Sequence, residues 1–221
     1  MRTVLSMLVV VVAACGGDDR PAGDCVPGSS QRYLPIAVGA TWSYSVYAVD
    51  APDVVTTKSQ RITGTMPDPT DGVDVFVQET VKSTGRTVNW LAVDGDRVVR
   101  RRQLDYTPDG ALERTTLYEP PRLRLDESPA HTAAGATFEV SYTEIELDPN
   151  GVEVDRRAIT EQWVVLDADA PCPDAFADID CLHVQRGQAG VPPKAFWFSR
   201  GIGKVREDGG QVEQLTACSL P

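Results

Sequence analysis

Five cysteines are the residues of this 221-residue chain best suited to chemistry, and they lie at positions 15, 25, 172, 181 and 218. Cysteines either pair as disulfides or bind zinc as thiolates. A zinc site would take Cys172, Cys181 and His183, but the two cysteines are too far apart for a Cys-x-x-Cys knuckle and no second knuckle exists. We therefore favour disulfide bonds, which require an oxidising compartment.

The first fifteen residues indicate export to such a compartment. Arg2 supplies a positive charge, a nearly unbroken apolar run extends from Val4 to Ala14, and the run ends in small residues. This arrangement is typical of a secretory signal, and the run is too short to remain as a membrane-spanning helix.

The segment Val12-Ala13-Ala14-Cys15 resembles the lipobox of bacterial lipoproteins. The resemblance implies that a signal peptidase removes residues 1–14 and that Cys15 becomes the lipid-bearing first residue of the mature protein. Gly16 resembles the outer-membrane sorting pattern, so we expect anchoring to the bacterial cell envelope at the outer membrane. The alternative is an ordinary secretory signal with an incidental cysteine.

The other four cysteines are an even number in an exported chain, which predicts two disulfide bonds with three possible pairings. We prefer Cys172–Cys181, which closes a short loop, and Cys25–Cys218, which joins the start of the folded body to its C-terminus.

Other catalytic candidates are few. A nucleophilic hydrolase needs a His base, yet the chain has only His131 and His183 and no Gly-x-Ser-x-Gly elbow. Aspartates between residues 167 and 180 could bind calcium, but they do not fit the Asp-x-Asp-x-Asp-Gly loop. A paired-carboxylate glycosidase stays open, although nothing selects two particular carboxylates. We predict no catalytic, cofactor-binding or metal-binding residues.

Arg97, Arg100, Arg101 and Arg102 form the densest basic run. In a strand Arg100 and Arg102 would face one way and Arg101 the other, so no single face collects them. The run could contact lipid phosphates or an anionic glycan. We favour the simpler interpretation that these charges protect an edge strand against aggregation.

Short segments of alternating apolar and polar residues fill the chain after residue 32, which is the pattern of half-buried strands. They cover 42–48, 54–64, 73–81, 86–93, 97–105, 111–118, 137–147, 152–167, 181–188, 194–200 and 211–216. Asp-Gly, Asn-Gly and Gly-Gly pairs between them favour tight hairpin turns. The predicted fold is mainly β, built of antiparallel meander sheets, with short helical turns only near residues 129–134 or inside the 172–181 loop.

Two halves of the chain resemble one another. Gly39-Ala40-Thr41-Trp42 matches Gly135-Ala136-Thr137-Phe138, and the segment from Trp90 to Val98 matches the one from Trp197 to Val205. We expect a first β-unit over 32–118 and a second over 119–221 that contains the disulfide loop 172–181, together forming a curved sheet, a half-barrel or a sandwich. Residues 15–31, rich in Gly, Pro, Asp and Ser, are predicted to be a flexible tether.

A second resemblance lies at the start of the first predicted β-unit. Its opening, Tyr33-Leu34-Pro35 followed by Gly39-x-x-Trp42-x-Tyr44, resembles that of a group of poorly characterised envelope lipoproteins. The ending 195–205, an aromatic strand with the turn Gly201-Ile202-Gly203 and the basic residue Lys204, resembles theirs as well. This resemblance implies a curved antiparallel sheet and transfers no catalytic residue.

The composition, 42% hydrophobic and 24% charged, is that of a globular protein, and the net charge of −11 argues against a nucleic-acid partner. We expect a non-enzymatic lipoprotein, held to the membrane through Cys15, whose sheet binds an apolar ligand or an envelope protein. The alternatives are a structural surface lipoprotein without a deep site and an envelope hydrolase.

Overall fold

The computed structural model describes Cys25 and residues 28–221. The predicted signal peptide 1–14, the predicted lipid-bearing Cys15 and most of the predicted tether lie outside these described residues. Within the described part of the chain, no helix is both long enough and apolar enough to cross a membrane.

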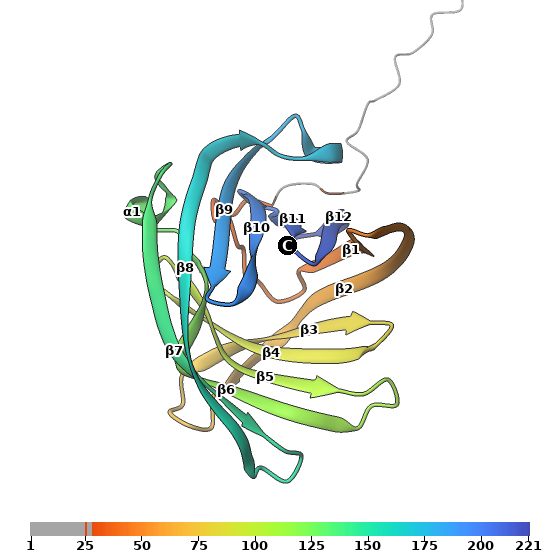
Figure 1. The fold of residues 1–221 in the computed structure, drawn as a ribbon, viewed down its shortest axis with the longest axis vertical. Helices are drawn as coiled ribbons and strands as arrows, with labels where there is room; N and C mark the ends of the chain where they lie inside the picture. Colours follow the sequence, from red (N-terminus) through yellow and green to blue (C-terminus); the bar gives the residue numbers. More distant parts are fainter. Residues whose placement is uncertain (1–24, 26–27) are drawn as a thin grey trace, which may run out of the picture.

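Antiparallel strands form one closed barrel in which every strand pairs with its sequence neighbours and the last strand pairs with the first (Figure 1). The strands are β1 (Thr41–Ala48), β2 (Ala51–Pro67), β3 (Asp74–Lys82), β4 (Gly85–Asp94), β5 (Arg97–Tyr106), β6 (Leu112–Asp126), β7 (Thr137–Leu147), β8 (Glu153–Pro171), β9 (Asp180–Gln188), β10 (Val191–Ser199), β11 (Gly203–Asp208) and β12 (Gln211–Ser219). The predicted mainly-β antiparallel meander is confirmed. The sheet is closed, however, so it is neither the curved sheet, the half-barrel nor the sandwich that we expected.

Closure depends on the pairing of β1 with β12, which runs from Thr41 opposite Ser219 to Ala48 opposite Gln211. This ladder satisfies backbone groups that an open sheet would leave exposed at its two outer strands. Short-range sequence patterns contain no information about it, because the two strands lie at opposite ends of the folded chain.

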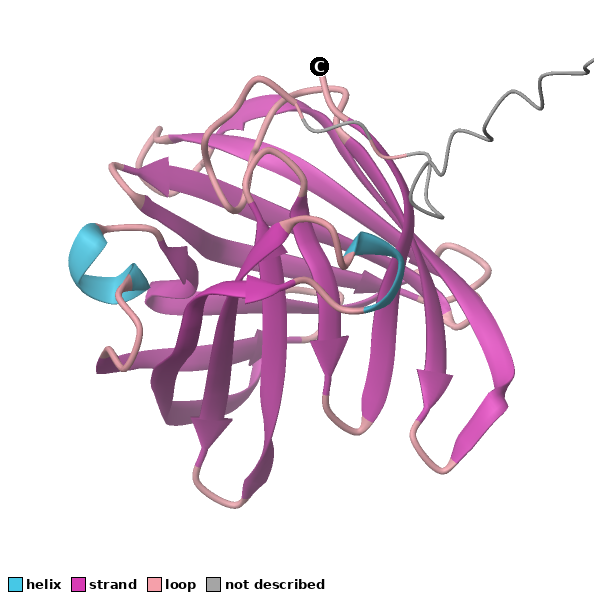
Figure 2. Cartoon of the chain, turned by 90° about the horizontal axis from the view of Figure 1, so that it is seen from above, coloured by secondary structure: helices cyan, strands magenta, loops and turns pink. Residues whose placement is uncertain are grey.

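The local elements follow the expected chemistry. In β1 the buried residues Trp42, Tyr44 and Val46 alternate with half-buried ones, as the period of two predicts. The predicted helical turns are α1 (Pro129–Thr132), at the outer rim of the molecule (Figure 2), and a single 3₁₀ turn over Asp174–Phe176 in the disulfide loop. The strand β11 is an addition to the predicted set, because it lies between the predicted strands 194–200 and 211–216.

The segments that precede β1 and β7 have the same hydrogen-bond pattern. Gly39 N donates to Ile62 O and Ile62 N donates to Ala40 O, both at 2.9 Å. In the second half Gly135 N donates to Val165 O at 2.9 Å, and Val165 N donates to Ala136 O at 2.8 Å. Both glycines have positive φ, 91° and 81°, which a residue with a side chain rarely adopts. Strands β1–β6 and β7–β12 then complete a single barrel together.

One end of the barrel is crossed by the chain that precedes β1. Tyr33 N and Leu34 N donate to the carboxylate of Glu127, each at 3.1 Å, and Gly201 N donates to Arg32 O at 2.8 Å. Leu34 points its side chain into the barrel's deep interior, where it meets Phe198 and other apolar residues. The opposite end carries the hairpin turns that join β1 to β2, β3 to β4, and so on around the barrel. We call these the closed end and the hairpin end.

Candidate functional site

The interior of the barrel is apolar toward the closed end and cationic toward the hairpin end. The apolar part is packed by residues such as Trp42, Trp163 and Phe198, and leaves a space of only about 30 Å³. Beyond it lies a cavity of about 310 Å³, which we call the basic cavity. Its lining reaches Lys82, the last residue of β3, so the basic cavity extends toward the hairpin end.

The charge of the basic cavity is opposite to that of the chain as a whole. Eight cationic side chains and two carboxylates line it, a surplus of six positive charges in a protein whose net charge is −11. The cations are Lys58, Lys82, Arg100, Arg122, Arg124, Arg186, Lys194 and Lys204, and the carboxylates are Glu207 and Glu213. Like charges collected in a space walled by protein create a strong local potential that favours anions.

Lysines and glutamates form part of the lining of the basic cavity. Lys204 Nζ lies 2.5 Å from Oε2 of both Glu207 and Glu213, Lys58 shares Glu213 Oε2 with it, and Lys194 Nζ donates to Glu207 at 2.8 Å. Burial opposes ionisation of both carboxyls, but the ammonium groups outweigh it and hold the pKa of each below its usual range. Both glutamates are therefore ionised and neutralise most of the lysine charge.

The pKa values of Lys58 and Lys204 shift in opposite directions, although both ammonium groups contact the carboxylate of Glu213. Burial, followed by the neighbouring charge of Lys204, lowers the pKa of Lys58 to about 7. Burial also disfavours the charged form of Lys204, but Glu207 and Glu213 raise its pKa above the ordinary lysine value. Lys204 is thus a permanent cation, and the charge of Lys58 changes near neutral pH.

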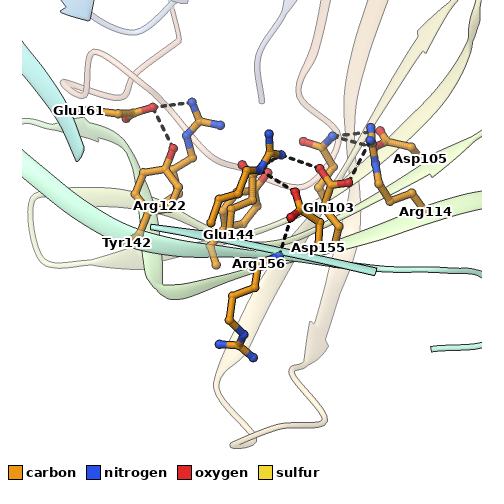
Figure 3. Close-up of polar contacts among 12 residues, drawn as sticks. Gln103, Asp105, Arg114, Arg122, Tyr142, Glu144, Asp155, Arg156 and Glu161 are labelled. Carbon is orange, nitrogen blue, oxygen red and sulfur yellow. Dashed lines mark hydrogen bonds and ion pairs between the residues drawn. The ribbon is translucent and has the colours of Figure 1, made fainter. Parts of the chain in front are cut away.

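Four arginines also line the basic cavity: Arg100 of β5, Arg122 and Arg124 of β6, and Arg186 of β9. We call them the arginine cluster. The carboxylate that contacts this cluster is that of Glu161, a residue that is 1% exposed. Glu161 Oε1 accepts hydrogen bonds from Arg122 Nη2 at 2.5 Å and from Tyr142 OH at 3.0 Å, and it lies 3.8 Å from Arg186 Nε (Figure 3).

The remaining two arginines of the cluster have no carboxylate partner among the described residues. Arg100 Nη1 donates to neutral acceptors, the side-chain oxygen of Gln103 and, at 3.5 Å, Tyr118 OH. Arg124 makes no hydrogen bond or ion pair within the described chain, and its surface is open to the cavity. Burial lowers the pKa of Arg124, and the charges of Arg100, Arg186 and Arg122 lower it further. The empty basic cavity therefore holds charges that repel one another.

Sequence reasoning did not find this site, although β6 contains a signal for it. After Pro120-Pro121 the chain reads Arg122-Leu123-Arg124-Leu125, which ordinarily predicts leucines facing the interior and arginines facing solvent. In the structure the arginines line the interior, and the leucines on the other face of the strand are buried as well. The apolar concave face that we expected is replaced by an interior that is half filled with apolar side chains and half cationic.

The basic run that the sequence did single out is divided between two surfaces. The register of β4 and β5 shifts between Trp90 opposite Arg102 and Leu91 opposite Arg100, so Arg101 is an extra residue and the strict alternation is broken. Arg100 enters the basic cavity, whereas Arg101 pairs with Asp68 at 2.8 Å and Arg102 lies over the ring of Trp90 at 4.3 Å. The interpretation as edge protection is wrong, because β5 pairs with a strand on each side.

The cysteines of the described chain pair as we prefer on sequence grounds. Cys25 is bonded to Cys218 with Cα atoms 4.7 Å apart, and Cys172 to Cys181 with Cα atoms 5.0 Å apart. The predicted lipid attachment residue, Cys15, is outside the described residues. The second bond closes a loop that packs Phe176 into the apolar cluster around Val205.

Neither histidine lies in the basic cavity. His131 Nδ1 contacts Asp126 at 2.9 Å, and His183 stacks on Trp197 with ring centroids 4.1 Å apart. The acidic loop does not converge on a point: Asp174 pairs with Arg206 at 2.5 Å, and the described residues contain no group of three or more His, Cys, Asp or Glu side chains that could bind a metal.

Comparison with known proteins gives little similarity. No protein-family model matches the sequence, and no curated protein matches it. A crystal structure of a "putative lipoprotein" from Parabacteroides distasonis ATCC 8503 is similar over 86% of this chain and 100% of that chain, at 10% sequence identity and a TM-score of 0.35. A superposition this loose carries no conclusion about the function of the chain.

Proposed function

We propose that this protein is a non-enzymatic lipoprotein of the bacterial cell envelope, anchored to the outer membrane through Cys15, whose barrel binds a small ligand. The basic cavity is the observation that supports binding most directly. Its volume of about 310 Å³ is at the lower end of the range for small-molecule sites, about 300–1,000 Å³. Its polar groups converge from several strands of one rigid sheet.

The charge inside the barrel argues for a ligand over a purely structural role. Removing a charged side chain from water is costly unless a counter-charge compensates for it. A barrel that served only as a surface scaffold could fill its interior with apolar residues, as the closed end of this barrel does. A cluster of four arginines, of which only Arg122 and Arg186 contact the carboxylate of Glu161, is instead typical of a site that a ligand completes.

The carboxylates of the basic cavity support binding over hydrolysis. A glycoside hydrolase needs one carboxyl group that keeps its proton near neutral pH, beside a second that is ionised. Glu207 and Glu213 lie on either side of the Lys204 ammonium group, which holds both in the ionised form. With both ionised, neither of them can act as the general acid.

Native mass spectrometry of the full-length lipoprotein, extracted from its own envelope in a mild neutral detergent, tests the proposal. We expect a second species heavier than the lipidated chain by a small-molecule mass, which disappears after denaturation and is recovered in the supernatant. The Arg156→Met variant is the control, since Arg156 is exposed on β8 and contacts Glu153; it should retain the ligand. A single unliganded species in both samples would contradict a binding function.

A further inference from the structure

Building on the proposed function, we propose that the ligand is a compact polyanion with two or more phosphoryl groups, bound in the basic cavity by the arginine cluster. Three features of the basic cavity support this ligand: the position of the uncompensated charge, the contacts that hold the guanidinium groups, and the space available.

The uncompensated charge is concentrated on the arginine cluster. Glu207 and Glu213 neutralise two of the three lysines that contact them, whereas the four arginines share one carboxylate, that of Glu161. The cluster therefore carries a surplus of three positive charges in the basic cavity. Arg100 and Arg124 supply two of these charges, and neither touches a carboxylate among the described residues.

Aromatic rings hold several of these guanidinium groups, in addition to the single carboxylate of Glu161. The guanidinium carbon of Arg186 lies 5.4 Å from the ring of Trp163 and 4.9 Å from that of Phe196. Arg122 lies 5.4 Å from the ring of Tyr142, and it has a buried Nε without a hydrogen-bond partner in the described structure. A ring orients a guanidinium through its π-face and leaves the N–H donors unused. The cluster is thus ordered while donors stay free for a ligand.

The shape and charge of phosphoryl groups suit this arrangement. A guanidinium offers parallel N–H donors that match two oxygens of a phosphate or a carboxylate. A phosphate monoester brings about 1.5 to 2 negative charges at neutral pH, whereas a carboxylate brings one. Two phosphoryl groups therefore offset a surplus of three charges within about 310 Å³. The apolar space beneath, about 30 Å³, has no room for an acyl chain.

The described chain starts at the end of the barrel away from the basic cavity, and this position favours a soluble molecule over a membrane lipid as the source of the phosphoryl groups. The described chain starts at the closed end, where Cys25 is bonded to Cys218 and Gly28 N donates to Gly201 O at 2.9 Å. The basic cavity extends toward the opposite end, to Lys82. The first described residue, Cys25, thus lies at the end of the barrel away from the basic cavity.

Calorimetric titration of the full-length protein in neutral detergent tests the proposal, with inorganic pyrophosphate as the soluble probe and citrate and acetate as carboxylate probes. We expect pyrophosphate to bind at least about ten-fold more tightly than citrate, and acetate to give no heat. Arg124→Met should weaken pyrophosphate binding by about ten-fold or more, the equivalent of one lost charge-assisted interaction. Arg156→Met should leave it unchanged. Arg100→Gln serves as a second variant with the same expectation if Arg124→Met does not fold.

The remaining outcomes separate the possibilities. A thermal shift caused by phosphatidic acid in the detergent micelles, without binding of pyrophosphate, would overturn the proposal, because the ligand would then be a lipid headgroup with a single phosphoryl group. Citrate binding as tight as that of pyrophosphate, or equal pyrophosphate affinity in wild type and Arg124→Met, would overturn the proposal. A co-purified ligand without phosphoryl groups would overturn it too, while leaving the proposed binding function intact.

Discussion

Replacing Arg124 by methionine should stabilise the ligand-free protein. Burial disfavours the cationic form of Arg124, the charges of Arg100, Arg186 and Arg122 disfavour it further, and the charge of Glu207 opposes them in part. Replacing buried ion pairs or triads by well-packed apolar groups is often neutral or stabilising, by about 1–4 kcal/mol. Because Arg124 is open to the cavity and keeps part of its hydration, we take the lower half of that range, about 1–2 kcal/mol. Methionine is unbranched and adapts to the space that the arginine stem leaves.

The assay is thermal unfolding of wild type and variant, both stripped of ligand. For a domain of this size 1 kcal/mol corresponds to about 2–4 °C in Tm, so the expected increase is about 2–8 °C. Arg156→Met is the matched control: its side chain is 53% exposed and pairs with Glu153, so its removal should change stability by less than about 1 kcal/mol.

Glu161→Gln should destabilise the ligand-free protein, whereas Arg124→Met should stabilise it, and both follow from the charge of the arginine cluster. Glu161 is the carboxylate that Arg122 and Arg186 share, and its loss would leave buried cations unpaired. We expect a loss of about 3–5 kcal/mol. If Arg124→Met lowered the Tm of the stripped protein, mutual repulsion within the arginine cluster would be the wrong description of the empty cavity.

Three further predictions concern the anchor, the disulfides and the pH dependence. Cys15→Ser should move the protein from the membrane to the soluble fraction, and unchanged membrane association on fractionation would disprove the lipid anchor. Cys218→Ser should destabilise more than Cys181→Ser in chemical denaturation, about 5 against about 3 kcal/mol in the chain-entropy model, because the bonds span 193 and 9 residues; an equal loss would contradict this. Burial lowers the pKa of Lys58 to about 7 in the folded protein. Between that pH and the ordinary lysine range the amine is protonated in the unfolded chain but neutral in the folded one, so the free energy of unfolding rises with pH in this interval. Lys58→Met should flatten this rise in denaturation curves recorded at several pH values, and an unchanged slope would assign it to other groups.

Strand content and turn positions were readable in the sequence because both depend on neighbouring residues. The Asp-Gly pairs at 71–72, 94–95 and 109–110 occur at turns, and each glycine has a positive φ, between 57° and 88°. Alternation in Trp42–Ala48 placed β1 correctly. The disulfide pairing that we preferred also follows from position, since one pair is close in the chain and the other joins its two ends.

The basic cavity could not be predicted from neighbouring residues, because its lining residues come from segments far apart in the chain. Its cations come from seven strands and extend from Lys58 to Lys204, so each strand supplies only one or two. Whether such a residue faces the interior depends on register shifts, such as the one that separates Arg100 from Arg102. A shift of one residue turns a side chain to the other face of a strand, and nothing in a single alternating segment indicates it.

The sequence by itself thus predicted an export signal, which stays a prediction, and determined the disulfide-forming cysteines and an antiparallel β architecture, since composition and short periodicities are enough for each. Only the tertiary structure decided that β12 closes the barrel onto β1 and that Arg100, Arg122, Arg124 and Arg186 face one another inside it. Closure and convergence depend on contacts between residues far apart in the chain. The free energy of those contacts comes from the packed and paired whole, not from any segment of it.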